Sequence, residues 1–332
     1  MQTLILSDEE VRGLLEVDEV IRAVEEAFKE KAFKRAIMPP KVYVNFQEFK
    51  GDLRVMPCYL PRLGVSSVKV VNVHPLNPKT KGLPTVMAVV ILIDPQTGLP
   101  LAVMSGTTIT DFRTGAAGAI AAKCLAKSKV EVVGLIGAGR QARTQLMGLF
   151  SVYGRLREVK VYDLAKSNLK AFIEYAEARF QDKASFREAE SPREAVEGSD
   201  IVVTATPSTK PIVKDEWVSP GVHFNCIGAD APGKEELDPM ILKRAKIVVD
   251  DYEQGIHSGE LNVPNRQGII RPEDIYSELG EIVAGLKPGR ESDEEITVFT
   301  STGLAIQDAV TAKLVYDKAL SRGLGVKMNL VL

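Results

Sequence analysis

Apolar residues recur along this chain with two different periods, and the change of period marks its organisation. Near the N-terminus, Ser7 followed by Glu10 has the capping-box pattern that opens a helix. A second helix is predicted from about Asp18, because apolar residues recur on one helical face at positions 20, 21, 24, 27 and 28. The prolines at 39 and 40 are expected to end this helix.

Between residues 41 and 105 the pattern changes to short runs rich in β-branched residues, which predict strands. The runs cover 41–46, 53–56, 65–73, 85–94 and 101–104, and the sequence Asp-Pro-Gln-Thr-Gly at 94–98 indicates a turn. This third of the chain is expected to form an antiparallel or mixed sheet flanked by helices. A helix rich in alanine and glycine should follow from about Asp111 to Ala126.

From Glu131 onward, strand patterns alternate with helical ones. Strands are predicted at 131–136, 158–163, 200–205, 222–227 and 246–250, and a second capping box is predicted at Ser191 and Glu194. A last strand at 296–299 precedes an amphipathic helix over 304–320. Strands that alternate with helices predict the α/β class, with a parallel, doubly wound sheet.

Composition narrows the classes of protein that fit. The 332 residues allow one or two domains, and 45% hydrophobic with 26% charged residues is ordinary for a globular chain. A net charge of -2 without long runs of one sign gives no sign of a nucleic-acid or membrane partner. The longest apolar run, 86–93, is too short to span a bilayer, and the first residues lack the basic start of a signal peptide. A cytoplasmic location is therefore expected by default.

Cysteine usage agrees with a reducing compartment. Cys58, Cys124 and Cys226 are odd in number and far apart, and none belongs to a C-x-x-C pair. A disulfide framework or a structural zinc site is not expected, and no metal is predicted.

The segment 132–142, Val-Val-Gly-Leu-Ile-Gly-Ala-Gly-Arg-Gln-Ala, has the strand–turn–helix context of a dinucleotide-binding motif. Gly137 would permit the tight turn, Gly139 would let the backbone approach phosphate, and Ala142 would keep the helix close to the strand. Arg140 and Gln141 would open the helix, whose N-terminus favours a pyrophosphate. The bare pattern occurs by chance, so a turn that binds nothing is the alternative.

Asp163 ends the next predicted strand, 26 residues after Gly137. An acid roughly 20 residues beyond the glycine motif accepts hydrogen bonds from the ribose hydroxyls of NAD and repels a 2′-phosphate. Leu164 and Ala165 follow where an NADP site often has Arg, Ser or Thr, although Lys166 points the other way. We therefore predict NAD. Two later strand ends should also face this cofactor, at Ser208, Thr209 and Lys210 and at Gly228 and Ala229.

Several segments together resemble the ornithine cyclodeaminase and mu-crystallin family, over nearly the whole chain: residues 54–57, 68–72, 110–116, 137–142, 225–238 and 301–308. The resemblance implies a Rossmann domain, 128–303, inserted in a smaller α+β domain for substrate binding and dimerisation, 1–127 plus 304–332. It also implies a homodimer joined through the N-terminal domain. Cys226 stands where the family usually has alanine.

Within that family, segments 38–43, 82–87 and 294–297 resemble the archaeal-type NAD-dependent alanine dehydrogenases. This implies oxidative deamination of L-alanine to pyruvate and ammonia. The alternatives are ornithine cyclodeamination, reduction of cyclic imino acids such as pyrroline-2-carboxylate, and a non-catalytic protein that binds a nucleotide and a small ligand. In each enzyme, the partner is a small amino or imino acid.

Lys69 is the predicted proton-transfer residue. In the apolar run 68–71 an ammonium would be costly to bury, and burial would bring its pKa towards neutrality. Strict alternation by itself favours the opposite, with Val68 and Val70 inside and Lys69 in solvent; the family resemblance reverses that choice. Asp230, at a strand end, is the second catalytic candidate, with a turn cap as the alternative.

The remaining candidates would bind carboxylate, phosphate or amide groups. Arg54 and Lys41 are predicted to bind the substrate carboxylate, with ordinary surface charge as the alternative. Arg113 would be a cation at a helix start, where an anionic partner is expected; the resemblance places it by the cofactor phosphates or the substrate carboxylate, and we group it with the cofactor. Ser301 could hydrogen-bond the nicotinamide amide or cap the last helix.

Overall fold

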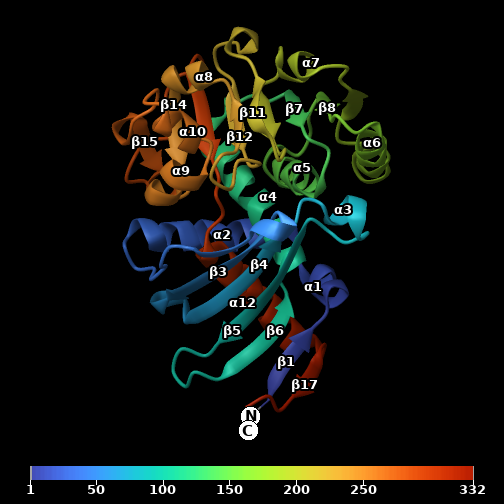
Figure 1. Ribbon diagram of the computed structural model, residues 1–332, viewed down its shortest axis with the longest axis vertical. Helices are drawn as coiled ribbons and strands as arrows, with labels where there is room; N and C mark the ends of the chain where they lie inside the picture. Colours follow the sequence, from blue (N-terminus) through green and yellow to red (C-terminus); the bar gives the residue numbers. More distant parts are fainter. Residues whose placement is uncertain (1, 332) are drawn as a thin grey trace. The chain divides into compact units, whose positions relative to one another are not determined.

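The computed structural model describes residues 2–331 (Figure 1), which form two compact units. The first contains Met1–Arg113 and Leu304–Leu332, and the second contains Thr114–Gly303. The chain passes from the first unit to the second within helix α4 (Gly106–Leu125) and returns just before helix α12 (Ala305–Arg322).

The first unit is built on a seven-stranded mixed sheet with the order β17-β1-β6-β5-β4-β3-β2. Within this sheet, as far as residues 2–331 describe it, only the β1–β6 pair is parallel. The strands are β1 (Thr3–Leu6), β2 (Val42–Phe46), β3 (Gly51–Leu60), β4 (Val65–Val73), β5 (Val86–Ile93), β6 (Pro100–Ser105) and β17 (Val326–Met328). The predicted mixed sheet is confirmed, including the bounds of β4.

Helix α12 packs against α2 (Val17–Ala32) and against β3, β4 and β5. The predicted apolar face of α2 is buried, with Val20, Val24 and Phe28 each 0% exposed. Short helices α1 (Asp8–Leu14) and α3 (Asn77–Thr80) and 3-10 turns at Gln47–Phe49 and Pro61–Leu63 complete the unit. The capping box at Ser7 is present in full.

The second unit contains an eight-stranded sheet with the order β15-β14-β16-β12-β10-β7-β8-β9, in which every pair is parallel. This confirms the α/β doubly wound class. The strands are β7 (Val132–Ile136), β8 (Glu158–Tyr162), β9 (Ser185–Glu188), β10 (Ile201–Thr204), β12 (His223–Cys226), β14 (Ala245–Val249), β15 (Ile275–Glu278) and β16 (Ile296–Thr300). A separate parallel pair joins β11 (Thr209–Val213) to β13 (Glu235–Leu237).

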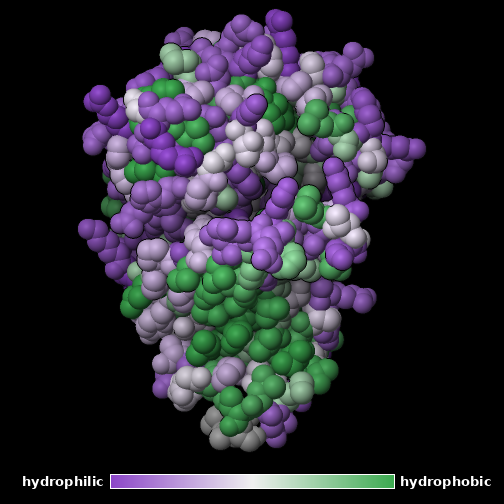
Figure 2. Space-filling view, viewed as in Figure 1, coloured by the Kyte–Doolittle hydropathy of each residue, from purple (hydrophilic) through white to green (hydrophobic). Residues whose placement is uncertain are grey.

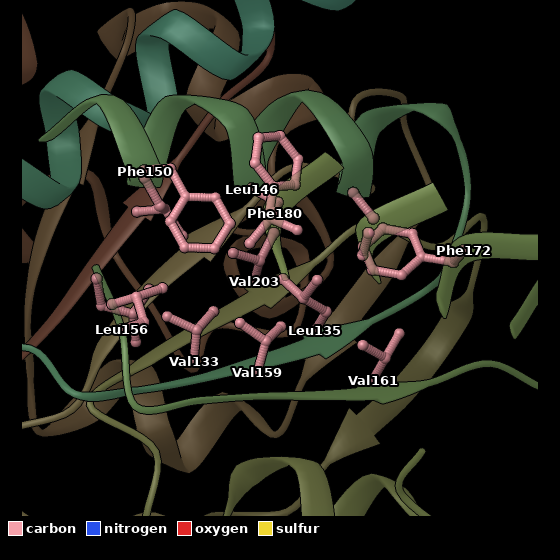
Figure 3. Close-up of a cluster of buried hydrophobic side chains, with 14 of the residues drawn as sticks. Val133, Leu135, Leu146, Phe150, Leu156, Val159, Val161, Phe172, Phe180 and Val203 are labelled. Atoms are coloured by element: carbon pink, nitrogen blue, oxygen red, sulfur yellow. The ribbon is translucent and has the colours of Figure 1, made fainter. Parts of the chain in front are cut away.

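The helices of the second unit follow its strands and cover the sheet (Figure 1). They are α5 (Arg140–Tyr153), α6 (Lys166–Phe180), α7 (Pro192–Val196), α8 (Pro239–Lys243), α9 (Tyr252–Ser258), α10 (Asn262–Arg266) and α11 (Leu279–Val283), with 3-10 turns at Asp215–Trp217 and Pro272–Asp274. Figure 3 shows one core of this unit, where α5 and α6 meet β7, β8 and β10. Strands covered on both faces are continuously apolar, which explains why they were predictable.

Three helix ends differ from prediction. Helix α2 ends at Ala32, before the prolines, because Phe33 caps it and Lys34 takes a left-handed conformation at φ 56°. Helix α4 begins at Gly106, five residues earlier than expected. At Ser191 only half of the capping box forms: Ser191 accepts from the Glu194 N–H, but the Glu194 carboxylate accepts from the Glu190 N–H instead.

Candidate active site

The glycine turn between β7 and α5 has the backbone that its sequence requires. Gly137 has φ +99°, which L-residues rarely adopt, and a Cβ there would lie 2.6 Å from the carbonyl oxygen of Ala205. The Gly137 N–H donates to the carbonyl of Tyr162 at 2.8 Å, which ties the turn to the end of β8. Ala142 is completely buried in the core beneath α5. A small residue at position 142 therefore lets α5 pack closely on β7, as the glycine motif predicts.

The start of α5 fits a dinucleotide pyrophosphate. Gly139 is the N-cap of this 14-residue helix, and it is exposed. A Cβ at Gly139 would meet no described atom within 4 Å, so the turn leaves room beside the backbone for a ligand group. Arg140 and Gln141 are the first two residues of the helix. Their N–H groups belong to the helix end that attracts phosphate.

Asp163 lies directly at this turn. Its Oδ2 accepts from the Ala138 N–H at 2.8 Å, and its Oδ1 accepts from the Ala165 N–H at 2.7 Å. The carboxylate that we predict to bind ribose is thus held by two backbone donors, one of them inside the glycine motif.

The two later strand ends lie on neighbouring strands of the same sheet, because β12 pairs with β10 and β10 with β7. After β10, the Ser208 hydroxyl donates to the Lys210 carbonyl at 2.7 Å, and Thr209 and Lys210 are exposed at the start of β11. After β12, Gly228 is partly exposed and Ala229 is fully buried.

Asp230 forms an ion pair with Lys234, at 2.5 Å from Oδ1 to Nζ. The same Nζ donates to the Gly228 carbonyl at 3.2 Å. Asp230 thus keeps a partly exposed carboxylate beside the segment that follows β12, with a cation from its own loop.

Ser301 does not cap the last helix. The N-cap of α12 is Leu304, so that alternative is wrong. Instead Ser301 lies beside Asp250, with 3.4 Å between its hydroxyl and Asp250 Oδ2. Asp250 also accepts from the N–H groups of Thr302 and Gly303, each at 2.7 Å. This buried aspartate, which sequence reasoning missed, therefore fixes the backbone after β16.

Lys69 points into the first unit, with 1% of its surface exposed. The buried positions along β4 are Val65, Ser67, Lys69 and Val71. Hydrophobicity alone would have placed the other set, which includes Val68 and Val70, on the inner face. Val68 and Val70 occupy the other face of the sheet. The lysine therefore replaces an apolar residue on the inner face, where α12 packs.

Lys69 belongs to a buried cluster of charges. Its Nζ lies 2.7 Å from Asp308 Oδ2 on α12 and donates to the Thr110 hydroxyl at 3.4 Å. Arg113 donates through Nε to Asp308 Oδ1 at 3.1 Å and through Nη1 to Gln307 Oε1 at 3.1 Å. One carboxylate thus serves two cations. Sequence reasoning gave Asp308 no role, although an acid between Ile306 and Ala309 on a buried helical turn was the available signal.

The environment of Lys69 lowers its pKa to about 7, from an ordinary value of 10.5. Burial is the largest cause, because removing an ammonium from water disfavours the charged form. Asp308 opposes this by attraction, and the nearby charges of Arg113 and Lys41 add to the lowering. A lysine in this state can take or give a proton near neutral pH.

Arg113 does not begin a helix, so the dipole argument for an anionic partner was wrong: α4 starts seven residues earlier. The partner exists nonetheless and is Asp308. Arg54 is 4% exposed and makes two hydrogen bonds with Asp52, at 2.8 and 3.1 Å, and its guanidinium lies 5.4 Å from the Tyr43 ring centre. It is therefore a braced, buried cation, whereas Lys41 is only partly buried.

Residues 2–331 contain neither a cluster of metal-ligating side chains nor a membrane-spanning helix. No group of three or more His, Cys, Asp or Glu side chains in this range could hold a metal ion. None of the helices in the same range combines the length and hydropathy needed to cross a bilayer. Cys58, Cys124 and Cys226 are free thiols.

A glycine turn, an acid at the end of β8 and a parallel doubly wound sheet define a Rossmann-type α/β protein. The sequence model of the ornithine cyclodeaminase/mu-crystallin family matches residues 1–323, and the chain belongs to this family. The alanine dehydrogenase of Archaeoglobus fulgidus is 54% identical over 329 residues, 99% of each chain. A Bacillus cereus Delta(1)-pyrroline-2-carboxylate reductase is 36% identical over 328 residues, 98% of this chain and 99% of that one.

Solved structures give the same relationship. An archaeal alanine dehydrogenase dimer with bound NAD has a TM-score of 0.94 at 54% identity, covering 99% of this chain and 100% of the other. Thermococcus litoralis Delta(1)-pyrroline-2-carboxylate reductase in complex with NADH and L-proline has a TM-score of 0.95 at 42% identity, covering 98% and 100%. The predicted family and fold are thereby confirmed.

Proposed function

We propose that this protein is an NAD-dependent dehydrogenase that converts L-alanine to pyruvate and ammonia, and catalyses the reverse reaction. The assignment of L-alanine as the substrate rests on the 54% identity with the Archaeoglobus fulgidus alanine dehydrogenase, which extends over 99% of both chains. The chemistry is supported by a buried lysine whose pKa is about 7. The cofactor is supported by the open N-terminus of α5 and by Asp163 at the glycine turn.

The overall reaction consumes L-alanine, NAD⁺ and water and yields pyruvate, ammonium, NADH and one proton. When bound, NAD accepts the hydride from the α-carbon. Gly137, Gly139 and the first residues of α5 would hold its pyrophosphate, and Asp163 its ribose. The segments containing Gly228 and Ser301 would line the rest of the cofactor site. These assignments, and those of Ser208, Thr209 and Lys210, are proposals.

On the amino-acid side, Lys69 would take the proton that the ammonium group of alanine must lose before its α-carbon can be oxidised. Arg54 and Lys41 would bind the carboxylate, since a guanidinium already braced by Asp52 loses little freedom on binding. Arg113 and Lys69 both contact Asp308. We therefore propose that Arg113 lies beside the substrate and not beside the cofactor phosphates. Asp230 would assist proton transfer to and from water and nitrogen when the imine is hydrolysed.

Reduction of a cyclic imino acid is the second candidate. It is favoured by the likeness to the Thermococcus litoralis reductase, whose structure contains NADH and L-proline. Both reactions move a hydride at the α-carbon of an amino acid, so the same lysine and glycine turn would serve either one.

The test is a substrate panel in which NADH and ammonia are recorded together. L-Alanine with NAD should yield both in equal amounts, and pyruvate with ammonium should consume NADH. NADH consumption with pyrroline-2-carboxylate but none with pyruvate would replace the proposal by the second candidate. Ammonia and proline from ornithine without net NADH would indicate cyclodeamination, and NAD binding without turnover a non-catalytic protein.

We further propose a homodimer formed through the sheet of the first unit. The face opposite α12 carries apolar residues on five paired strands: Val42, Val44, Leu53, Val55, Val68, Val70, Val89, Ile91 and Val103. Figure 2 shows an extended hydrophobic surface over β3, β4, β5 and β6. A contiguous patch of this kind usually marks an interface. The related archaeal alanine dehydrogenase structure is a dimer.

Replacing Val89 with lysine should therefore dissociate the dimer. Val89 is 45% exposed and lies between β4 and β6, so a charge there would have to be buried in the interface. Sedimentation velocity should show a mass near 36.2 kDa for V89K and twice that for the wild type. Leu164, 88% exposed on the second unit, supplies the control: L164K should remain dimeric. A V89K protein that remains dimeric would place the interface elsewhere.

We also propose a role for each unit and a cellular location for the protein. We assign substrate binding and dimerisation to the unit with both chain ends, and NAD binding to the unit with the doubly wound sheet. A reducing cytoplasm suits the free thiols of Cys58 and Cys226, both of which are buried.

A further inference from the structure

Three turns at one edge of the parallel sheet are packed backbone against backbone. A Cβ at Gly228, after β12, would lie 2.1 Å from the carbonyl oxygen of Thr206, after β10. A Cβ at Gly137, after β7, would lie 2.6 Å from the carbonyl oxygen of Ala205. Any side chain at Gly137 or Gly228 would therefore force these turns apart.

These turns lie where the direction of strand addition reverses. From β7 the chain adds β8 and β9 on one side, and then returns to place β10 and β12 on the other. In sheets of this kind a ligand binds at the carboxyl ends of the strands at that reversal. The Thr206 and Gly228 segments are thus beside the predicted dinucleotide site.

A single buried carboxylate joins two of the three turns. Glu236, on β13, is 0% exposed. Its Oε1 accepts from the N–H and the hydroxyl of Thr206, both at 2.7 Å, and its Oε2 accepts from the Gly228 N–H at 3.0 Å. Each oxygen therefore holds a different turn, and both oxygens must be acceptors for the arrangement to exist.

A second buried carboxylate supports the first. Glu260 Oε1 accepts from the N–H groups of Glu236 and Leu237, at 2.8 and 2.6 Å, while the Glu260 N–H donates to the Thr300 hydroxyl at 2.9 Å. Its buried Oε2 has no hydrogen-bond partner among the described residues. Burial, followed by the charge of Glu236, raises the pKa of Glu260 well above its ordinary value. Burial raises the pKa of Glu236 as well, but three donors converge on its two oxygens and favour its ionised form. We therefore take Glu236 as the anion of the pair and Glu260 as the neutral acid.

We propose that Glu236 is a positioning residue for dinucleotide binding: its ionised carboxylate holds the Thr206 and Gly228 turns in the arrangement that receives the cofactor. The inference rests on the proposed NAD site. Glu260 acts behind it as a neutral acid that fixes the backbone of β13.

The test compares two substitutions of the same kind. Glu236→Gln keeps the size of the side chain but puts an amide nitrogen, a donor, against either the Thr206 N–H or the Gly228 N–H. One buried donor loses its acceptor, so the dissociation constant for NAD, measured by isothermal titration calorimetry, should rise about tenfold or more. Glu260→Gln replaces a neutral acid by a neutral amide and keeps the oxygen that accepts from Glu236 and Leu237. Its dissociation constant should stay within about twofold of the wild type.

Two further measurements separate positioning from general damage. In E236Q without cofactor, deuterium exchange of peptides covering 204–209 and 226–231 should be faster, while peptides of the first unit are unchanged. At saturating NAD, the kcat of E236Q should remain within about threefold of the wild type, because the deficit lies in cofactor binding. NAD binding by E236Q equal to the wild type, or equal weakening in E260Q, would overturn the inference. A wild-type protein that does not bind NAD would instead refute the proposed function.

Discussion

Replacing Lys69 with alanine is expected to lower turnover of alanine about 10²–10⁴-fold, which is the usual contribution of a general acid–base residue. NAD affinity should change little, because Lys69 belongs to the first unit and the glycine turn to the second. Initial rates of NADH formation and a calorimetric titration with NAD measure the two effects separately. A K69A protein with full activity would refute the assigned role.

Two controls make this result specific. Lys69→Met keeps most of the side-chain volume in a site that is 1% exposed, so it should fold and be as inactive as K69A. Lys79→Ala, at an exposed lysine of the same unit, should be fully active. In the wild type, alanine oxidation should increase with pH through about 7, because the neutral amine of Lys69 is the form that accepts a proton and its pKa is about 7.

Replacing Asp308 with asparagine should have the second large effect, on both stability and pH dependence. The carboxylate is 0% exposed and contacts Lys69 and Arg113. Lys69 can respond by losing its proton, but Arg113 cannot, so a buried guanidinium is left without its counter-charge. Removing one partner of a buried ion pair typically costs about 3–5 kcal/mol of unfolding free energy. Urea unfolding measures that loss.

The pH dependence of D308N has a defined sign. Asp308 raises the pKa of Lys69, so its removal lowers that pKa further below the ordinary value. Lys69 then becomes neutral at lower pH, and the acidic limb of the alanine-oxidation profile should move to lower pH by at least about one pH unit. Asp317→Asn is the matched control, since Asp317 pairs with Lys313 on the exposed side of the same helix. It should change stability by less than about 1 kcal/mol and leave the profile in place. An unshifted limb in D308N would show that Asp308 does not influence the titrating group.

How much was predictable depended on how strongly burial constrained each segment. Strands covered on both faces, such as β7 and β10, have continuous apolar sequences and were placed within a residue or two. The strands β9, β11, β13 and β15 are short and largely polar, so no hydrophobic pattern indicated them. The first turn of α4 was missed because Gly106, Thr107 and Thr108 are poor helix formers, and packing rather than propensity makes them helical.

The parts of the candidate site whose residues lie close together in the sequence were predictable. Gly137, Gly139 and Asp163 are related by a known spacing, and the structure brings the acid to the turn. The partner of Arg113 is 195 residues away, and no local pattern reports such a contact. For Lys69, the local pattern gives the wrong location: simple alternation along β4 would have placed it in solvent. Burying a lysine is costly unless a residue distant in sequence supplies the compensating charge.

The first unit is assembled from both ends of the chain, and this has a consequence for its biosynthesis. Asp308 is made 239 residues after Lys69, so at about 5–20 residues per second its appearance lags by roughly 10–50 seconds. During that interval the inner face of the sheet lacks α12, the helix that packs on β3, β4 and β5. The parallel sheet of the second unit is completed first. Lys69 therefore acquires its buried environment only after α12 has been made, so the sheet of the first unit has to persist incomplete until that helix emerges.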